Sequence, residues 1–182
     1  MVWRILFGFL CLPLLALLGF VVQDARAHRY GVMAQTAYQA GRYQVAALSV
    51  EQALQLGASN AELWLERAEI ERSRWLLQQE NGSEARMKTS FERAAALSPF
   101  WAQPLDNRSQ VEAAVQDYAA ALRSISAAIA RAPSSGTYRV LQGQYLELSG
   151  DEVGAVQAYQ KALSLYDSPE ATAALTRLGV KL

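Results

Sequence analysis

Small and large apolar side chains recur at helical spacing along much of the chain, and the stretch 150–163 shows this most clearly. Spacings of three and four residues place side chains on one face of an α-helix. The pattern predicts two helices in close approach, with one aromatic ring filling the gap between them. The face combines four small residues with one large aromatic residue: Gly154, Ala155, Ala158, Ala162 and Tyr159.

The small residues recur at a fixed interval. Ala94, Ala128 and Ala162 are evenly spaced, at an interval of about 34 residues. The step from Ala53 to Ala94 is one such interval plus an insertion of about seven residues, or two helical turns. An even interval of this length is typical of a repeat made of two helices joined by a turn. The chain is therefore predicted to be all-α and to consist of stacked helical hairpins.

Turn signals divide the chain into four predicted hairpins and one closing helix. The turns within the hairpins are indicated by glycines and polar pairs at residues 41, 81–82, 116–117 and 150. The predicted hairpins cover about residues 27–58, 59–99, 100–133 and 134–167, and a capping helix covers 168–180. Such a helix would shield the open face of the last repeat, as solenoids require.

Several predicted helix ends carry capping signals. Gly57 follows the last turn of a helix, where a residue with a left-handed backbone is expected. Ser59 and Glu62 have the Ser-x-x-Glu spacing of a capping box. Ser168 followed by Pro169 predicts the start of the final helix, with serine as the cap and proline at the first helical position.

Two of the predicted hairpins depart from the regular pattern. In the second, residues 74–79 prolong the first helix by about two turns and account for the insertion. In the third, residues 105–109 lack the expected aromatic residue and glycine. We therefore expect the first helix of the third hairpin to be short.

Residues 27–167 resemble the tetratricopeptide repeat family. Trp64 stands where the family often carries a tryptophan, and Ala68 stands where it carries a small residue. Arg108 and Gln142 depart from the pattern, because the family has apolar residues there. The resemblance implies a right-handed superhelical solenoid in which the first helix of each hairpin lines a concave groove.

The resemblance also implies that a partner protein is bound in this groove. Polar side chains of mixed charge at the groove positions suit an extended peptide held by hydrogen bonds. The alternative is that each is an ordinary exposed helix residue. The positions of the family's clamp for C-terminal carboxylates carry Gly31, Gln35, Leu65 and Glu69, so a chaperone tail is not expected. The candidate groove residues are Gln35, Tyr38, Gln39, Glu69, Arg72, Ser73, Gln110, Gln144 and Glu147.

A second candidate partner-binding surface is aromatic. It comprises Trp75 and Leu76 with the adjoining Leu77 in the prolonged helix, and Phe100 and Trp101 in the following connection. If these side chains cluster, they form an apolar patch of the kind that marks protein contacts. The alternative is that they pack against one another inside the protein.

The N-terminal segment contains 18 uncharged residues, Ile5–Val22. As a helix it would reach about 27 Å, close to the hydrocarbon thickness of a bilayer. We favour a transmembrane anchor within residues 1–26, because the run exceeds the 7–15 residues of a signal-peptide core. The alternative is a secretory signal peptide cleaved near Ala27, which leaves His28 as the mature N-terminus. Both interpretations place the repeats outside the cytoplasm.

Charge and residue chemistry narrow the function further. Lysine plus arginine equals aspartate plus glutamate at 17 each, so no net field favours nucleic acid. His28 and Cys11 are the only histidine and cysteine, so neither a metal site nor a cofactor is expected. Four carboxylates alternate with arginines and predict a solvated helix face with local ion pairs: Glu62, Glu66, Glu69 and Glu71. An enzyme is not expected.

The sequence leads to one preferred function and two alternatives. We expect a membrane-anchored scaffold that binds a partner protein at the extracytoplasmic face (periplasmic in a bacterium), as an assembly factor or accessory subunit of an envelope complex. One alternative is a structural subunit that self-assembles, or packs into a larger complex, through Trp75 and Trp101. The other is a secreted peptide-binding module released by signal-peptide cleavage.

Overall fold

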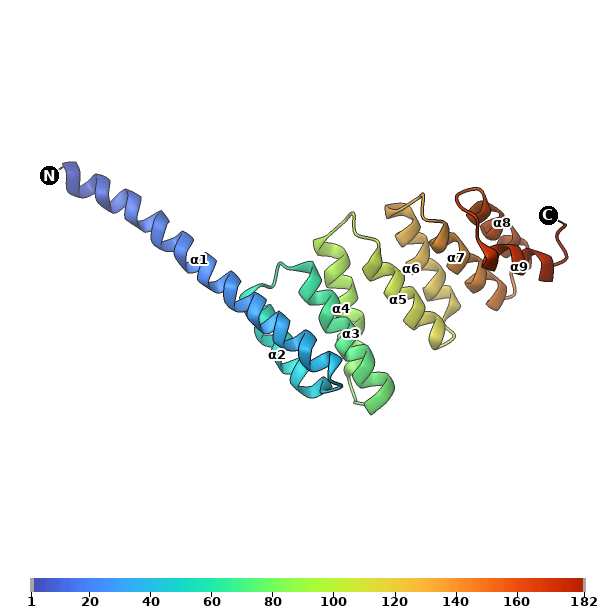
Figure 1. The fold of residues 1–182 in the computed structure, drawn as a ribbon, viewed down its shortest axis with the longest axis horizontal. Coiled ribbons are helices and arrows are strands. Elements are labelled where there is room, and N and C mark those ends of the chain that lie inside the picture. Colours follow the sequence, from blue (N-terminus) through green and yellow to red (C-terminus); the bar gives the residue numbers. More distant parts are fainter. Residues whose placement is uncertain (1, 182) are drawn as a thin grey trace. The chain divides into compact units, whose positions relative to one another are not determined.

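The computed structural model describes the backbone of residues 2–181 and the side chains of residues 16–181. Within this part of the chain all regular elements are α-helices (Figure 1). The helices form two compact units, residues 1–97 and residues 98–182. The division lies within the predicted solenoid, between the second and third predicted hairpins.

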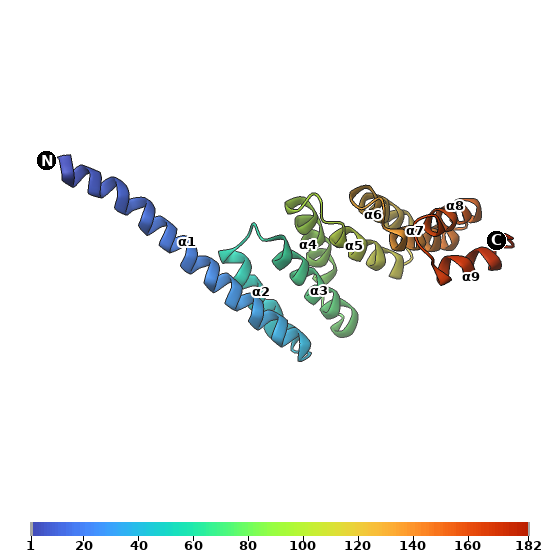
Figure 2. The same cartoon turned by 45° about the horizontal axis from the view of Figure 1, so that its top comes forward.

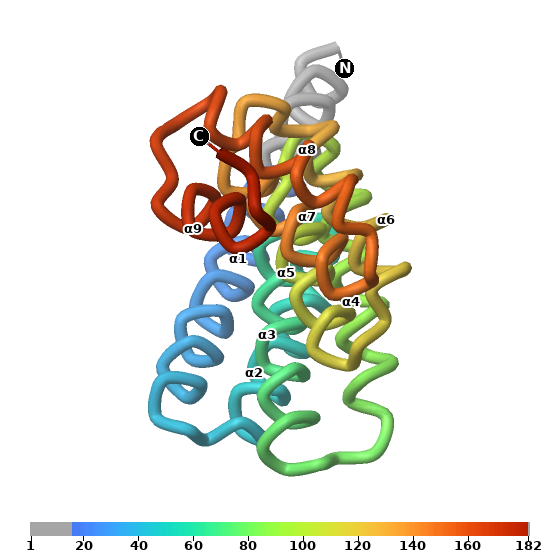
Figure 3. The backbone as a smooth tube through the Cα atoms, turned by 90° about the vertical axis from the view of Figure 1, so that its right-hand side faces the viewer, coloured from blue at the N-terminus to red at the C-terminus, as the bar shows by residue number. Residues whose placement is uncertain are grey.

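The first unit consists of two helical hairpins. Its four helices are α1 (Val2–Gln39), α2 (Tyr43–Leu56), α3 (Ala61–Gln78) and α4 (Ser83–Leu97). In each hairpin the two helices pack along each other, and α2 also packs against α3. The α1–α2 turn and the α3–α4 turn lie at the same end of this unit (Figure 3).

The core of the first unit is made of apolar side chains from the facing sides of its helices. Ala34 of α1, Val50 of α2 and Ile70 of α3 are almost completely buried in one cluster. Tyr30 and Trp64 pack against this cluster at its edge. The core therefore follows the three- and four-residue spacing of the sequence pattern.

The second unit contains two further hairpins and a closing helix. Its helices are α5 (Gln103–Ala114), α6 (Tyr118–Arg131), α7 (Gly136–Leu148), α8 (Glu152–Leu163) and α9 (Pro169–Arg177). α6 packs against α7, and α9 packs against α8. Ala171 and Leu175 of α9 are fully buried in the cluster that also contains Tyr159, so α9 covers the last hairpin as predicted.

The second helices of the four hairpins carry equivalent buried positions. One position, near the end of each helix, holds a fully buried alanine, and another, about one turn earlier, holds a larger buried residue. The predicted environment of the periodic alanines is therefore confirmed. The alanines are Ala53, Ala94, Ala128 and Ala162, and the larger residues are Val50, Phe91, Ile125 and Tyr159.

The close approach predicted around Tyr159 is present between α7 and α8. A Cβ atom added to Gly143 of α7 would lie 2.6 Å from Cε1 of Tyr159. This separation is too short for two carbon atoms, so the glycine lets the ring lie directly on the backbone of α7. Tyr159 is 1% exposed. The aromatic ring fills the gap between the two helices, as the sequence indicates.

Most of the predicted turns and caps are found. Gly41, Gly82 and Gly150 adopt left-handed backbone angles at the turns within three of the hairpins. In the third hairpin Gln116 takes this role with φ of 62°, and the Asp117 side chain caps α6. The predicted cap of the final helix is confirmed, because Ser168 accepts a hydrogen bond from the amide of Ala171.

Two cap predictions are wrong. Gly57 has φ of −135°, which is not left-handed, and its amide simply donates to the carbonyl of Ala53. The capping box led by Ser59 does not form. Asn60 caps α3 instead, and its side chain accepts hydrogen bonds from the amides of Glu62 and Leu63. Asparagine is at least as good a cap as serine, so the chain enters α3 one residue later.

Of the predictions for the two irregular hairpins, one is confirmed and one is wrong. α3 extends to Gln78, so the predicted prolongation of this helix is confirmed. α5, expected to be short, has 12 residues and equals α8 in length. Its central part is held by Ser109, whose hydroxyl donates to the carbonyl of Asp106 and lies 3.3 Å from the hydroxyl of Tyr145.

The prediction of a solvated charged face on α3 is wrong for Glu71 and Arg74, which are only 3% and 6% exposed. Arg74 Nη1 donates to Glu71 Oε1 at 2.8 Å, and Arg74 Nη2 donates to Gln44 Oε1 at 2.9 Å and also bonds to Glu80. Arg86 Nη2 forms an ion pair with Glu71 Oε2 at 3.1 Å. The prolonged part of α3 is thus covered by the ends of α2 and α4.

The N-terminal segment continues into the first hairpin. α1 extends without a break to Gln39, and its N-terminal half projects beyond α2 (Figures 1 and 2). Among the residues with described side chains, no helix is long and apolar enough to cross a membrane. Residues 5–15 of the predicted anchor, and Cys11 with them, lie outside those residues. The anchor therefore stays a prediction.

Candidate partner-binding site

In the first unit, the first helix of each hairpin, α1 and α3, contributes to one face. Gly31 of α1 faces Leu63 of α3, and a Cβ atom on Gly31 would lie 3.2 Å from Leu63 Cδ2. Further along the two helices the hydroxyl of Tyr38 lies 3.1 Å from Oγ of Ser73. The helices are thus in direct contact at both places.

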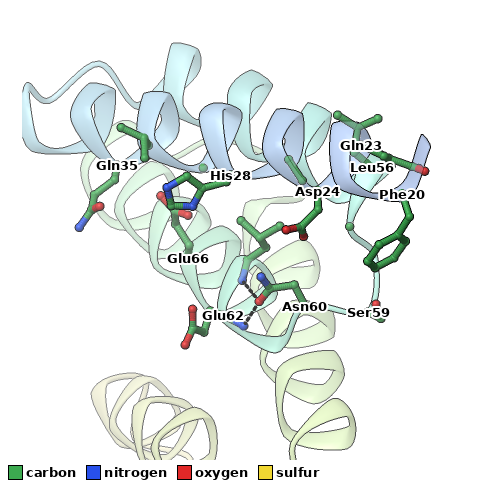
Figure 4. A pocket seen from close by; sticks show the side chains of 15 residues that line it. Phe20, Gln23, Asp24, His28, Gln35, Leu56, Ser59, Asn60, Glu62 and Glu66 are labelled. Carbon is green, nitrogen blue, oxygen red and sulfur yellow. Dashed lines mark hydrogen bonds between the residues drawn. The ribbon is translucent and has the colours of Figure 1, made fainter. Parts of the chain in front are cut away.

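A cavity of about 760 Å³ opens beside this contact, towards the N-terminal half of α1 (Figure 4). This volume is in the range of known ligand sites. Its walls come from α1, from α3 and from the segment that joins α2 to α3. We call it the α1–α3 cavity. It is lined by Phe20, Gln23, Asp24, Ala27, His28, Gly31, Val32, Gln35, Leu56, Gly57, Ser59, Asn60, Glu62, Leu63 and Glu66.

Glu66 is the electrostatically unusual residue of the α1–α3 cavity. Burial raises the pKa of its carboxyl group to about 7. Its Oε1 atom is buried and has no hydrogen-bond partner among the described residues. Burial without a counter-charge penalises the ionised form, which is the cause of this pKa shift. His28 lies on the opposite wall, and Asp24 and Glu62 complete the charged lining (Figure 4).

The candidate groove residues of the first unit have unequal surroundings. Gln35 is exposed and lines the α1–α3 cavity. Tyr38 and Ser73 contact each other, and Arg72 is half-buried in an ion pair with Glu69. Gln39, at the end of α1, is exposed. The open part of this face is therefore around Gln35 and continues towards the N-terminal half of α1.

Two of the three candidate groove residues of the second unit, Gln110 and Glu147, form hydrogen bonds within the protein. Gln110 and Gln144 are exposed, and Gln110 Nε2 donates to Asp106 at 3.0 Å. Glu147 accepts a two-pronged hydrogen bond from Arg177 of α9 and another from the hydroxyl of Tyr159 at 3.1 Å. Burial and the bond to Glu147 raise the pKa of Tyr159 to about 12. Glu147 thus joins α7 to both α8 and α9.

The candidate aromatic residues are divided between the two units. In the first unit Leu76 is 55% exposed, and Trp75 is half-buried beside a small cavity at the α3–α4 turn. In the second unit Phe100 is 92% exposed, and the carbonyl of Trp101 accepts a hydrogen bond from Arg131. Each unit therefore exposes apolar side chains of its own. Their part in partner binding stays a prediction.

Sequence reasoning missed the acidic lining of the α1–α3 cavity. Asp24, His28, Gly31 and Gln35 follow one another at four- and three-residue spacing, which places them on one face of α1. The same spacing extends the candidate groove from Glu69 back to Glu66 and Glu62. This helical spacing is the sequence signal for the acidic lining, whose carboxylates lie outside the groove positions that the family resemblance implies.

Among the described side chains, the types that could bind a metal ion are histidine, cysteine, aspartate and glutamate. No group of three or more histidine, cysteine, aspartate or glutamate residues among them is arranged to hold a metal ion. The buried carboxylates Glu71 and Glu112 are bonded to Arg74 and Arg108 respectively. These groups act as structural ion pairs.

Helical hairpins with periodic small residues define the chain as a helical-repeat protein, and comparison with known families makes this specific. The family model described as the tetratricopeptide repeat matches residues 32–100 and 107–172. These two matches cover most of the chain, which therefore belongs to the tetratricopeptide repeat family. The fold is typical of non-enzymatic scaffolds for protein–protein interaction.

Several solved structures have a similar fold. PilF of Pseudomonas aeruginosa has a TM-score of 0.67 and 16% identity over 86% of this chain and 68% of its own. PilW, a widely conserved type IV pilus biogenesis factor, has a TM-score of 0.63 and 20% identity over 84% and 68%. YrrB, a TPR protein with an unusual peptide-binding site, has a TM-score of 0.64 and 16% identity over 82% and 74%. No curated protein matches the sequence.

Proposed function

We propose that this protein is a membrane-attached scaffold that holds an extended segment of a partner protein on the α1–α3 face. The observation that carries the proposal is the α1–α3 cavity, a hollow of about 760 Å³ between the first helices of two adjacent repeats. Its lining combines polar groups that can orient a peptide with apolar side chains that can bury part of it.

The proposal includes attachment to a membrane through Ile5–Val22, with the repeats on the extracytoplasmic side. Its support is the 18-residue uncharged run and the exposure of the apolar residues in the part of that run whose side chains are described. Leu17, Leu18 and Phe20 are 60%, 62% and 67% exposed, and water is an unfavourable environment for such a series. In this setting the protein acts as an assembly factor or accessory subunit of an envelope complex.

Known proteins of similar fold are consistent with such a role. PilW is a pilus biogenesis factor and YrrB has a peptide-binding site, and both resemble this chain in fold. Assembly of a surface structure and peptide recognition are thus both compatible with the same architecture.

Site-specific photo-crosslinking tests the partner-binding role. A photoreactive amino acid at Gln35, on the cavity wall, should crosslink the full-length protein to one dominant partner in its native cells. The same amino acid at Arg93, exposed on α4, is the matched control and should not give that product. Equal crosslinking from both positions, or a protein that always purifies alone in mild detergent, would contradict the proposal.

Membrane attachment has a separate test. Intact-mass measurement of the protein from native membranes should give a mass that includes the segment Ile5–Val22. Alkaline carbonate, which strips peripheral proteins, should leave it in the membrane pellet. The mass of a chain that begins at His28 would instead support the secreted alternative. A soluble chain that retains Ile5–Val22 would contradict both the anchored and the secreted protein.

A structural, self-assembling subunit is the second candidate function. The exposure of Phe100, at 92%, is the observation that favours it. Light scattering of the solubilised protein should then show an oligomer that a Phe100→Ser variant disrupts. A monomer in both cases would remove this candidate.

A further inference from the structure

The α1–α3 cavity contains a carboxylate with one buried oxygen that has no hydrogen-bond partner among the described residues. Oε1 of Glu66 is inaccessible to water and accepts no hydrogen bond from the side chains or backbone that the structure describes. Leaving an acceptor buried and unsatisfied is unfavourable, and more so when the group is charged. The residue as a whole is half-buried and lines the cavity, so a positively charged ligand that meets the accessible part of the Glu66 carboxylate would offset this cost.

The charges around the α1–α3 cavity favour a cation as that ligand. Asp24 and Glu62 line it together with Glu66, and no ion pair is found for these three among the described residues. The nearest arginines of α3 along the sequence bond elsewhere. Arg67 pairs with Glu51 at 3.2 Å, and Arg72 pairs with Glu69. The cavity is therefore acidic in a chain whose net charge is zero.

The apolar part of the lining limits what kind of cation fits. Leu63 and Ala27 are buried beneath the cavity, and Val32 and Phe20 are exposed at its rim. A small inorganic cation would gain nothing from these side chains. A lysine or arginine side chain has an apolar stem that packs on such surfaces while its charged end reaches a carboxylate.

We propose that the α1–α3 cavity binds a lysine or arginine side chain from an extended segment of the partner protein, with the half-buried Glu66 as its counter-ion and Glu62 at the rim. This inference rests on the proposed function and adds the chemistry of the bound segment. The stem lies along Leu63, and Gln35 is free to hydrogen-bond the backbone of the segment.

Binding of a basic side chain should weaken as the pH falls through 7, because Glu66 is then protonated. The other titratable groups that face Glu66 across the cavity are Asp24 and His28 on α1 and Glu62 on its own helix. The segment between α2 and α3 adds only neutral groups. A His28→Asn variant removes the imidazole that faces the cavity and so isolates the contribution of Glu66.

Peptide display on the full-length protein in mild detergent tests the inference. A library of random dodecapeptides should give peptides with lysine or arginine at one constant position. The best peptide, made synthetically, should bind Glu66→Gln about tenfold or more weakly than the unmodified protein, the effect of losing one charge-assisted hydrogen bond. Glu152→Gln, which removes an exposed carboxylate of α8, is the matched control and should change the affinity less than about twofold.

Two further variants make the result independent of any effect of Glu66→Gln on folding. Glu62→Lys places a positive charge at the exposed rim and should weaken binding about threefold or more. His28→Asn should keep the loss of affinity between pH 8 and pH 6, whereas Glu66→Gln should abolish it.

The possible results separate the inference from the proposed function. Selected peptides that lack a basic residue, or that bind Glu66→Gln and Glu62→Lys as well as the unmodified protein, would overturn the inference and leave a peptide-binding scaffold. Peptides that lose affinity only in the Glu152→Gln variant would overturn it too. A library that yields no binder would overturn both proposals.

Discussion

In the second unit, Tyr159 of α8 lies on Gly143 of α7, and the hairpin is held by a buried ring. In the first unit, Phe91 of α4 and Ala68 of α3 hold the corresponding positions of the repeat, and both are almost completely buried. In addition to this type of core, the first unit has a buried charged network where α3 is prolonged. The repeat pattern thus places a large apolar side chain at the centre of both hairpins. In the hairpin that exceeds the repeat length, the additional helical turns are stabilised by buried ion pairs instead.

The largest expected effect is the removal of either aromatic ring. Tyr159→Ala should destabilise the second unit by about 3–5 kcal/mol, and Phe91→Ala should do the same in the first, because each leaves a cavity in a closed core. Hydrogen exchange followed by mass spectrometry measures this separately for α7–α8 and α3–α4. If either substitution costs less than about 1 kcal/mol, the two positions are not equivalent.

The charged network gives the next largest effect. Arg74→Ala should cost about 3 kcal/mol, because it leaves the buried carboxylate of Glu71 without its principal partner. The double variant Glu71→Leu and Arg74→Met should be close to neutral, since apolar side chains of similar size often replace a buried ion pair without loss. Urea denaturation of the first unit, followed by tryptophan fluorescence, measures both. A double variant as unstable as the single one would mean that the ends of α2 and α4 need the charges themselves.

Glu66 sharpens the comparison, because it is a carboxylate of α3 that lacks the arginine partner of Glu71. Its pKa is raised from 4.5 to about 7, so the folded state holds the proton more tightly and loses stability as the pH rises from 4.5 to 7. Glu66→Gln should therefore stabilise the protein by about 1 kcal/mol at pH 8, after allowance for solvent screening, and hardly at all at pH 4.5. Chemical denaturation at the two pH values measures this. A loss of stability at pH 8 would contradict the assigned cause.

The smallest expected effect concerns two glutamines with left-handed backbone, one in each unit. Gln79 has φ of 51° after α3, and Gln116 has φ of 62° before α6. Glycine adopts these angles without strain, but it also gives the unfolded chain more freedom, so Gln79→Gly and Gln116→Gly should each stabilise by about 0.5 kcal/mol. Thermal unfolding measures the change. A loss of stability in one variant alone would show that its side chain makes a compensating contact.

The helices and the apolar core could be predicted from the sequence, because the spacing of small residues along the chain shows which positions share a helix face. Ala128 and Ala162 mark the same position in their hairpins, and spacing alone shows this. The same holds for the left-handed turn at Gly150 and for the cap at Ser168. Such features involve residues only a few positions apart, so a pattern along the chain suffices.

The charged residues could not be placed in the same way. Glu69 and Glu71 look alike in sequence, yet one pairs with Arg72 near the surface and the other is buried with Arg74. The difference comes from Gln44 and Arg86, which belong to other helices and reach the prolonged end of α3 only in the folded chain. For the same reason the sequence did not show that Oε1 of Glu66 would be buried without a partner.

The unbroken course of α1 has a consequence for the angular relation between its two halves. Each residue advances an α-helix by about 100°, so the apolar face that includes Phe20 has a fixed azimuth relative to Ala27 and Ala34, which are buried in the repeats. Insertion of one residue after Asp24 would rotate one half against the other by about 100°, while four residues would nearly restore the alignment. The continuous first helix therefore fixes the rotational orientation of the apolar segment relative to the first repeat.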